Sequence, residues 1–158
     1  MKRYEMEIGA INAAITLFNS YLVAEFHIPR FEINSAIENR QIVEILHGKW
    51  DDFPFPNSGT RGVYFLLGHE KFHPEKNGLY IGKASFQSST SNRLASHLNP
   101  HRYNEHFTMN YGKEIYVLDF MASIDLDTLG IPFMASALEE HLILTLRSQF
   151  QLMNGTGN

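Results

Sequence analysis

The chain has 158 residues, of which 44% are hydrophobic and 19% are charged, and it has a formal net charge of −4 and no cysteine. This length and composition predict one packed domain, residues 1–158, and exclude an intrinsically disordered chain. The lack of cysteine excludes disulfides, zinc–thiolate centres and cysteine nucleophiles, and it fits a reducing compartment.

The N-terminal residues do not form a secretory signal pattern, because Glu5 and Glu7 interrupt the segment before any apolar stretch. No apolar run reaches the roughly 18 residues that a membrane span requires. We therefore expect a soluble, cytoplasmic protein with no membrane partner.

Charge is unevenly distributed along the chain. Residues 53–113 contain seven lysines and arginines against three acidic residues, whereas the rest contains six against fourteen. The net charge speaks against a nucleic-acid partner, but this asymmetry concentrates positive potential on one part of the molecule if the segment forms one face. Chance clustering in the sequence is the alternative.

The N-terminal residues 1–60 have a helical pattern. Apolar residues recur there at three- and four-residue steps: Ile8, Ile11, Ile15, Phe18 and Leu22. This stripe predicts an amphipathic helix that packs on the core, with a partner-binding or dimerising helix as the alternative. A second helix is predicted from Ser35, where capping-box spacing begins, to about Gly48, followed by a proline-containing loop at 50–60.

Residues 63–67 and 79–82 alternate in the manner of strands, and the polar segment 69–78 connects them. Because side chains alternate across a strand, Tyr64 and Tyr80 lie opposite the aliphatic residues of their strands. If the two strands pair antiparallel, both phenols can project from one face.

Three further elements are predicted: a short helix at 90–98, a buried strand at 114–120 and a long helix at 132–150. Arg93 and His97 are four residues apart and share a helix face. The arginine suits a phosphate, although a surface pair of ordinary side chains is the alternative.

Glu139 and Glu140 on the final helix face different surroundings. Residues three, four, seven and eleven positions after Glu139 are apolar, whereas Arg147 and Ser148 follow on the face of Glu140. A carboxylate at a buried stripe needs a counter-ion or a metal. Glu139 is therefore either a metal ligand or a member of a salt bridge, for example with Arg93.

A zinc site at His97, His101 and His106 is disfavoured, because Pro100 breaks any helix that could align the first two and no suitably spaced acid is nearby. No phosphate-binding glycine loop of the Walker type is present.

The phrases Gly62-Val63-Tyr64 and Tyr80-Ile81-Gly82 resemble the two signature phrases of the GIY-YIG nucleases. Arg93, Glu139 and Asn154 match that family's arginine, metal-binding glutamate and late asparagine in order. The resemblance covers about residues 61–155. The pattern of His97 four residues after Arg93 is similar to that of the family's restriction endonucleases.

The chain also departs from the family. The spacer 65–79 is longer than usual, Val63 replaces an isoleucine, and the proline that often precedes the late asparagine is absent before Asn154. The resemblance implies an α+β fold with a small, mainly antiparallel, three-stranded sheet flanked by helices. Residues 61–158 would form this core, and 1–60 a helical extension.

The resemblance further implies a divalent-metal-dependent endonuclease that hydrolyses DNA phosphodiester bonds, of restriction or phage-defence type. Glu139 would hold Mg²⁺ or Mn²⁺, Arg93 would clamp the phosphate, and Tyr64 and Tyr80 would orient the attacking water. Two further residues would bind the substrate, Lys83 and Asn154. Double-stranded DNA is the expected partner, and a double-strand cut favours a homodimer, with the N-terminal helices as its interface.

The residue patterns do not decide which group accepts the proton of the attacking water. A phenol with a pKa of about 10 is mostly protonated at neutral pH, whereas an imidazole with a pKa of about 6.5 is mostly neutral. Our hypothesis is that Tyr64 positions the water or relays its proton, and that His97 accepts it.

Two other functions compete with a DNA nuclease. One is a catalytically inactive nucleic-acid-binding or regulatory module on the same scaffold, since a fold does not establish activity. The other is a nuclease directed at RNA or single strands, for which the sequence offers no specific aromatic stacking pattern.

Overall fold

The computed structural model describes residues 1–47, 55–98, 102–103 and 106–154. Helices and strands follow one another in this order: η1 (Lys2–Tyr4), α1 (Glu5–Asn19), η2 (Ala24–Phe26), α2 (Ile33–Glu38), β1 (Ile42–Glu44), β2 (Gly62–Glu70), β3 (Asn77–Ala84), α3 (Thr90–Leu98), β4 (Arg102–Tyr103), β5 (His106–Tyr111), β6 (Glu114–Asp125), η5 (Pro132–Met134) and α4 (Ala135–Leu146), where η marks a 3₁₀ turn.

The strands form an open sheet in the order β3-β2-β6-β5-β4. In addition, β1 pairs with residues 120–122 of β6. Every described strand pair is antiparallel. The α+β class and the antiparallel pairing of β2 with β3 are confirmed. The expectation of three strands is wrong, because β1 and β5 both pair with β6 on the side away from β2.

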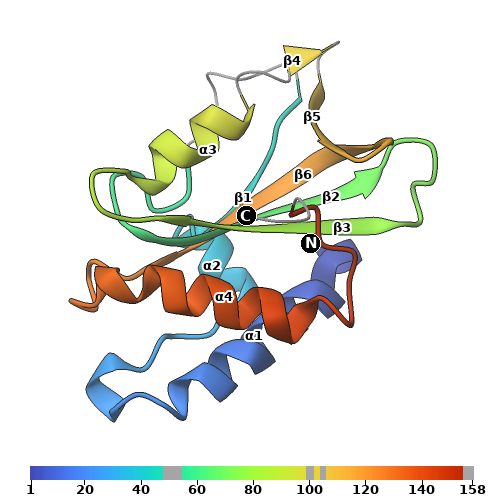
Figure 1. Ribbon diagram of the computed structural model, residues 1–158. Helices are drawn as coiled ribbons and strands as arrows, with labels where there is room; N and C mark the ends of the chain where they lie inside the picture. The colour runs from blue at the N-terminus through green and yellow to red at the C-terminus, as the bar shows by residue number, and fades with distance from the viewer. Residues whose placement is uncertain (48–54, 99–101, 104–105, 155–158) are drawn as a thin grey trace.

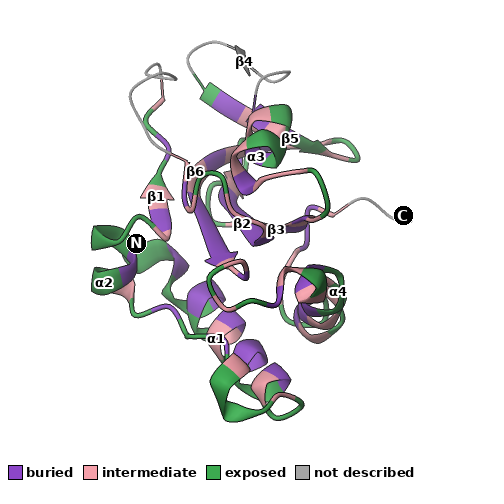
Figure 2. Ribbon diagram, turned by 90° about the vertical axis from the view of Figure 1, so that its left-hand side faces the viewer, coloured by how far each residue is buried: buried purple, intermediate pink, exposed green. Residues whose placement is uncertain are grey.

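Helices cover both faces of the sheet (Figure 1). On one face lie α1, α2 and α4, and they bury the β2 residues Val63, Phe65 and Leu67. On the other face lies α3, whose Leu94 and Leu98 pack in one cluster with Tyr64 and Leu66. The strands between the layers are largely buried, while the outer surfaces of the helices are exposed (Figure 2). The strand alternation predicted from the sequence therefore assigns each side chain to the correct face.

The N-terminal segment belongs to the same core as the sheet. The stripe on α1 is buried against β2, β3 and α4, so the interpretation of a core-packing helix is confirmed. Asn12 and Asn19 then fasten the chain that returns from α1. Each uses its side-chain amide to bond both the N–H and the carbonyl of one residue, Phe31 and Ile28 respectively.

The second helix is shorter than predicted. α2 begins at Ile33 instead of Ser35 and ends at Glu38, and Arg40 then adopts a positive φ of 56°. The chain continues into β1, whose β-branched residues pair with β6. The predicted end at Gly48 lies outside the described residues, as do positions 50–54 of the predicted loop.

The later elements agree with their predicted positions but differ in length. The helix at 90–98 is confirmed as α3. The strand predicted at 114–120 extends to Asp125, and the helix predicted at 132–150 is a 3₁₀ turn followed by α4, which ends at Leu146. No helix among the described residues combines the length and the apolar character needed to cross a membrane.

Candidate active site

Tyr64 and Tyr80 lie side by side on the face of the sheet that α3 covers. Their ring centroids are 6.2 Å apart and the rings are nearly parallel. Gly82 is paired directly with Tyr64 across the two strands. A Cβ on Gly82 would lie 2.7 Å from Cε2 of Tyr64, and closer still to its Cζ and hydroxyl oxygen. The glycine of the second phrase thus leaves the space that the Tyr64 ring occupies.

The glycine of the first phrase has a different steric role. A Cβ on Gly62 would lie 3.0 Å from the backbone carbonyl carbon of Ile124, and closer to its oxygen. Since a backbone carbonyl within a paired strand cannot move aside cheaply, Gly62 allows β2 and β6 to approach closely at this end of the sheet.

His97 completes a three-ring cluster with the tyrosines. The buried Leu94 and Leu98 fix α3 on the sheet, which directs His97 toward the phenols. The Tyr64 hydroxyl and His97 Nε2 are joined by a hydrogen bond of 2.9 Å. The His97 ring also lies edge-on to Tyr80, with centroids 4.8 Å apart. The three rings therefore lie together on the face of the sheet that α3 covers.

The pKa values of both phenols are raised. For Tyr64 the main cause is burial, the Tyr80 phenol adds to the rise, and the charge of Arg93 opposes it. Burial also dominates the rise in the pKa of Tyr80, where the Glu139 carboxylate adds to it and Arg93 again opposes it. Both hydroxyls therefore stay protonated at neutral pH. Arg93 and Glu139 lie close enough to act on this cluster.

Glu139 reaches the site from the opposite layer. Its Oε2 lies 3.2 Å from Nζ of Lys83 on β3, the edge strand, and its side chain is 20% exposed. The adjacent Glu140 is exposed, as the helix periodicity predicts. Glu139 therefore forms a salt bridge, but with Lys83 instead of Arg93. Its predicted position at the margin of the apolar stripe is confirmed.

A divalent ion is compatible with this carboxylate. Mg²⁺ commonly binds proteins through one or two carboxylates and takes its other ligands from water and substrate phosphates. Glu139 is partly exposed, and its contact with Lys83 engages one oxygen. Within the described residues no group of three or more histidine or acidic side chains is arranged to hold a metal. An ion here would therefore depend on Glu139, water and substrate.

Asn154 is bound to the backbone of the edge strand. The segment 151–153 runs along β3, with hydrogen bonds to both backbone groups of Leu79. The Asn154 side chain then accepts from the N–H of Ile81 at 3.0 Å and donates to its carbonyl at 2.6 Å. Its amide is thus used to extend the sheet edge next to Tyr80. The predicted contact of Asn154 with substrate stays a prediction.

A second polar cluster was not predicted. Asp119 on β6 accepts hydrogen bonds from Tyr4 at 2.5 Å and from Nδ1 of His69 at 2.7 Å, and His47 lies 3.9 Å away. His106 contacts His47, with ring centroids 4.7 Å apart, and the predicted companion position 101 is outside the described residues. One feature of the sequence could have indicated this cluster: Asp119 is a lone carboxylate within an apolar strand, and a carboxylate in such a place needs hydrogen-bond partners.

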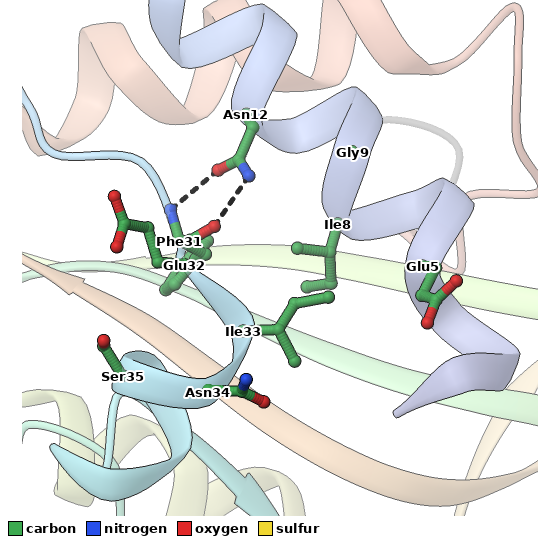
Figure 3. Close-up of a pocket in the computed structure, with 9 residues that line it drawn as sticks. All are labelled: Glu5, Ile8, Gly9, Asn12, Phe31, Glu32, Ile33, Asn34 and Ser35. Carbon is green, nitrogen blue, oxygen red and sulfur yellow. Dashed lines mark hydrogen bonds between the residues drawn. The ribbon is translucent and has the colours of Figure 1, made fainter.

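A cavity between elements of the N-terminal segment lies away from the tyrosine cluster. It has a volume of about 480 Å³, lies between α1 and α2 and is shown in Figure 3. Ile8, Phe31 and Ile33 line it together with the carboxylates of Glu5 and Glu32. These carboxylates disfavour a phosphate there, and the basic side chains of Lys83 and Arg93 lie on other elements.

No family model, curated protein or solved structure matches this chain. The arrangement of the chain's own side chains is therefore the basis for inferring its function. Of the seven predicted site residues, Tyr64, Tyr80 and His97 form the ring cluster, and Arg93 and Glu139 act on its phenols electrostatically. Lys83 contacts Glu139. The seventh, Asn154, supports β3.

Proposed function

We propose that the protein is a divalent-metal-dependent endonuclease that hydrolyses DNA phosphodiester bonds. The observation that supports this most is the 2.9 Å hydrogen bond between the buried Tyr64 hydroxyl and His97, beside Tyr80 and within electrostatic reach of Arg93 and Glu139. Five groups with these chemical properties are not needed together for packing.

The hydrogen bond provides a route for one proton. As a water attacks phosphorus, Tyr64 can take the water's proton while its own hydroxyl proton passes to Nε2 of His97. Two protons are transferred together, one from water to Tyr64 and one from Tyr64 to His97, so no free phenolate is required. The raised pKa of Tyr64 makes this relay more reasonable than a phenolate base.

The charged residues would act on the phosphate. Arg93 is exposed at the surface of α3 and can donate two parallel hydrogen bonds to phosphate oxygens. Lys83 can move from Glu139 to a phosphate oxygen when the carboxylate binds a cation. Mg²⁺ or Mn²⁺ on Glu139 would supply Lewis-acid stabilisation of the charge that develops on phosphate and leaving oxygen.

Double-stranded DNA is the proposed substrate. Residues 53–113, which carry the excess of basic side chains, include β2, β3 and α3, the elements that hold the tyrosine cluster. Binding through a small number of phosphate contacts should weaken steeply with salt. One such site cuts one strand, so cleavage of both strands would need two copies. The apolar stripe of α1 is buried within the chain and does not provide their interface.

A supercoiled plasmid tests the proposal directly. We expect nicking with Mg²⁺ or Mn²⁺ and none with EDTA. Glu139→Gln and Tyr64→Phe should each lower the rate by at least 100-fold, on the order expected for a lost ligand or acid–base group. Glu140→Gln, one position along the same helix but exposed, is the matched control and should retain activity. Lack of metal-dependent cleavage of both DNA and RNA would instead support a non-catalytic module.

A further inference from the structure

The loop between β3 and α3, residues 85–89, contains the most exposed large apolar side chain of the described residues. Phe86 is 92% exposed, and its φ of +57° is in the left-handed region that residues other than glycine rarely adopt. The ring gains nothing from burial, and the backbone conformation would suit glycine or asparagine better. Strained conformations of this kind concentrate at functional sites.

The loop is anchored at both ends beside the candidate active site. Ala84 at the end of β3 pairs with Gly62, the first residue of β2. At the start of α3, the backbone N–H and the hydroxyl of the buried Thr90 both donate to the carbonyl of Thr60, at 2.8 and 3.0 Å. The phenylalanine is therefore held on a short fixed turn, three residues after Lys83.

The surroundings of this ring match the two chemical parts of a nucleotide. Lys83 at the end of β3 precedes Phe86 by three residues, and Arg93 on α3 follows it by seven. The two elements that this loop joins therefore each carry a cation suited to phosphate, and the loop itself carries an exposed aromatic plane suited to a base. Grooves that bind unpaired strands combine the same two features. One ring by itself is too small to form a stable protein interface, which buries roughly 800 Å² on each partner.

We propose that Phe86 stacks on a nucleobase next to the scissile phosphate, and that the protein therefore prefers DNA in which this base is already unpaired. The inference rests on the proposed nuclease function and specifies its substrate. In an intact duplex the base must first leave the helical stack, and a mismatched or bulged base has less pairing energy to lose.

The test compares binding of two duplexes of identical length, one fully paired and one with a single mismatch beside 2-aminopurine. Binding is measured by fluorescence anisotropy in the Glu139→Gln background, and stacking by quenching of the 2-aminopurine. We expect tighter binding of the mismatched duplex. Phe86→Ala should weaken that binding by roughly 5- to 100-fold and abolish the quenching, while Phe86→Trp should restore both.

Phe72→Ala is the matched control, because Phe72 is 70% exposed and follows β2 at the opposite end of the hairpin. It should change binding by less than about twofold. Equal affinities of the Phe86→Ala and Phe72→Ala variants, or a mismatch preference that survives Phe86→Ala, would overturn the inference while leaving the nuclease proposal intact if the plasmid is still cut. A wild-type protein that neither binds nor cuts any nucleic acid would overturn both.

Discussion

Gly82 has no Cβ, and this leaves the space in which the Tyr64 ring lies beside His97. In Gly82→Ala the new Cβ overlaps the Tyr64 ring, which must shift and so disturbs its hydrogen bond with His97. We expect nicking to fall by at least tenfold, with a stability loss of about 1–3 kcal/mol from overpacking. Gly9→Ala is the control, since a Cβ there meets nothing within 4 Å and should stabilise α1 by about 0.5–1 kcal/mol.

The relay between Tyr64 and His97 predicts how the rate depends on pH. Burial raises the pKa of Tyr64, so this phenol remains protonated from pH 5.5 to 8 and gives no step in that range. An imidazole can accept a proton only in its neutral form, so if His97 is the acceptor, acid should slow the wild-type reaction and the rate should rise with pH. His97→Ala should be slower and should lack this rise. A profile of unchanged shape in single-turnover assays would remove His97 as the proton acceptor.

At the scale of elements, the Asn154 side chain makes hydrogen bonds to the edge of β3 of the kind that a neighbouring strand would make. The Asn154 amide pairs with the backbone N–H and carbonyl of Ile81. Asn154→Asp keeps the acceptor but replaces the donor with an oxygen that faces the Ile81 carbonyl. We expect a loss of about 1–3 kcal/mol in the free energy of unfolding and faster hydrogen exchange at the Leu79 and Ile81 amides. Asn110→Asp, on the exposed face of β5, should leave that exchange unchanged.

Local patterns predicted those elements that are long or carry distinct alternation. Alternating residues predicted β2 and β3 as strands and placed each phenol opposite the aliphatic residues of its strand. The common face of the two phenols depended on antiparallel pairing, which the structure has. β1 was missed because three residues contain too little periodicity, and its strand form depends on the distant β6. β5 was missed although it had a signal: Phe107 and Met109 alternate with polar residues before Gly112, which has a φ of +61°.

At the scale of the whole molecule, the sequence predicted the elements that carry the candidate site residues but not how the layers bring these elements together. The order of the motif residues placed Tyr64, Tyr80, Arg93 and His97 on the correct elements. The pairing of Glu139 with Lys83 across an edge strand could not be derived, because it depends on where α4 crosses the sheet. The Asp119 cluster was equally hidden, since its members come from segments separated by as many as 115 positions.

The Asp119 cluster joins the N-terminal segment to the sheet and should make the stability of the whole protein depend on acid. Burial alone would raise the pKa of Asp119, but the nearby His47 and the hydrogen bonds from Tyr4 and His69 lower it from 3.8 to about 2. Because the folded-state pKa is depressed, the stabilisation is fully present above pH 3.8 and is lost as the pH falls toward 2. A shift of this size corresponds to about 2 kcal/mol.

Urea denaturation of wild type and Asp119→Asn between pH 2 and 6 measures this term. We expect the variant to be less stable by about 2 kcal/mol at pH 6, with the difference shrinking toward pH 2, because protonation progressively removes the charge of Asp119 and asparagine has none. Tyr4→Phe should lose part of the same pH dependence, since it removes one of the hydrogen bonds that favour the carboxylate. Glu140→Gln should run parallel to wild type. The difference in the free energy of unfolding between wild type and Asp119→Asn could instead stay constant with pH. Packing at this position, and not the charge of Asp119, would then couple residues 1–47 to the sheet.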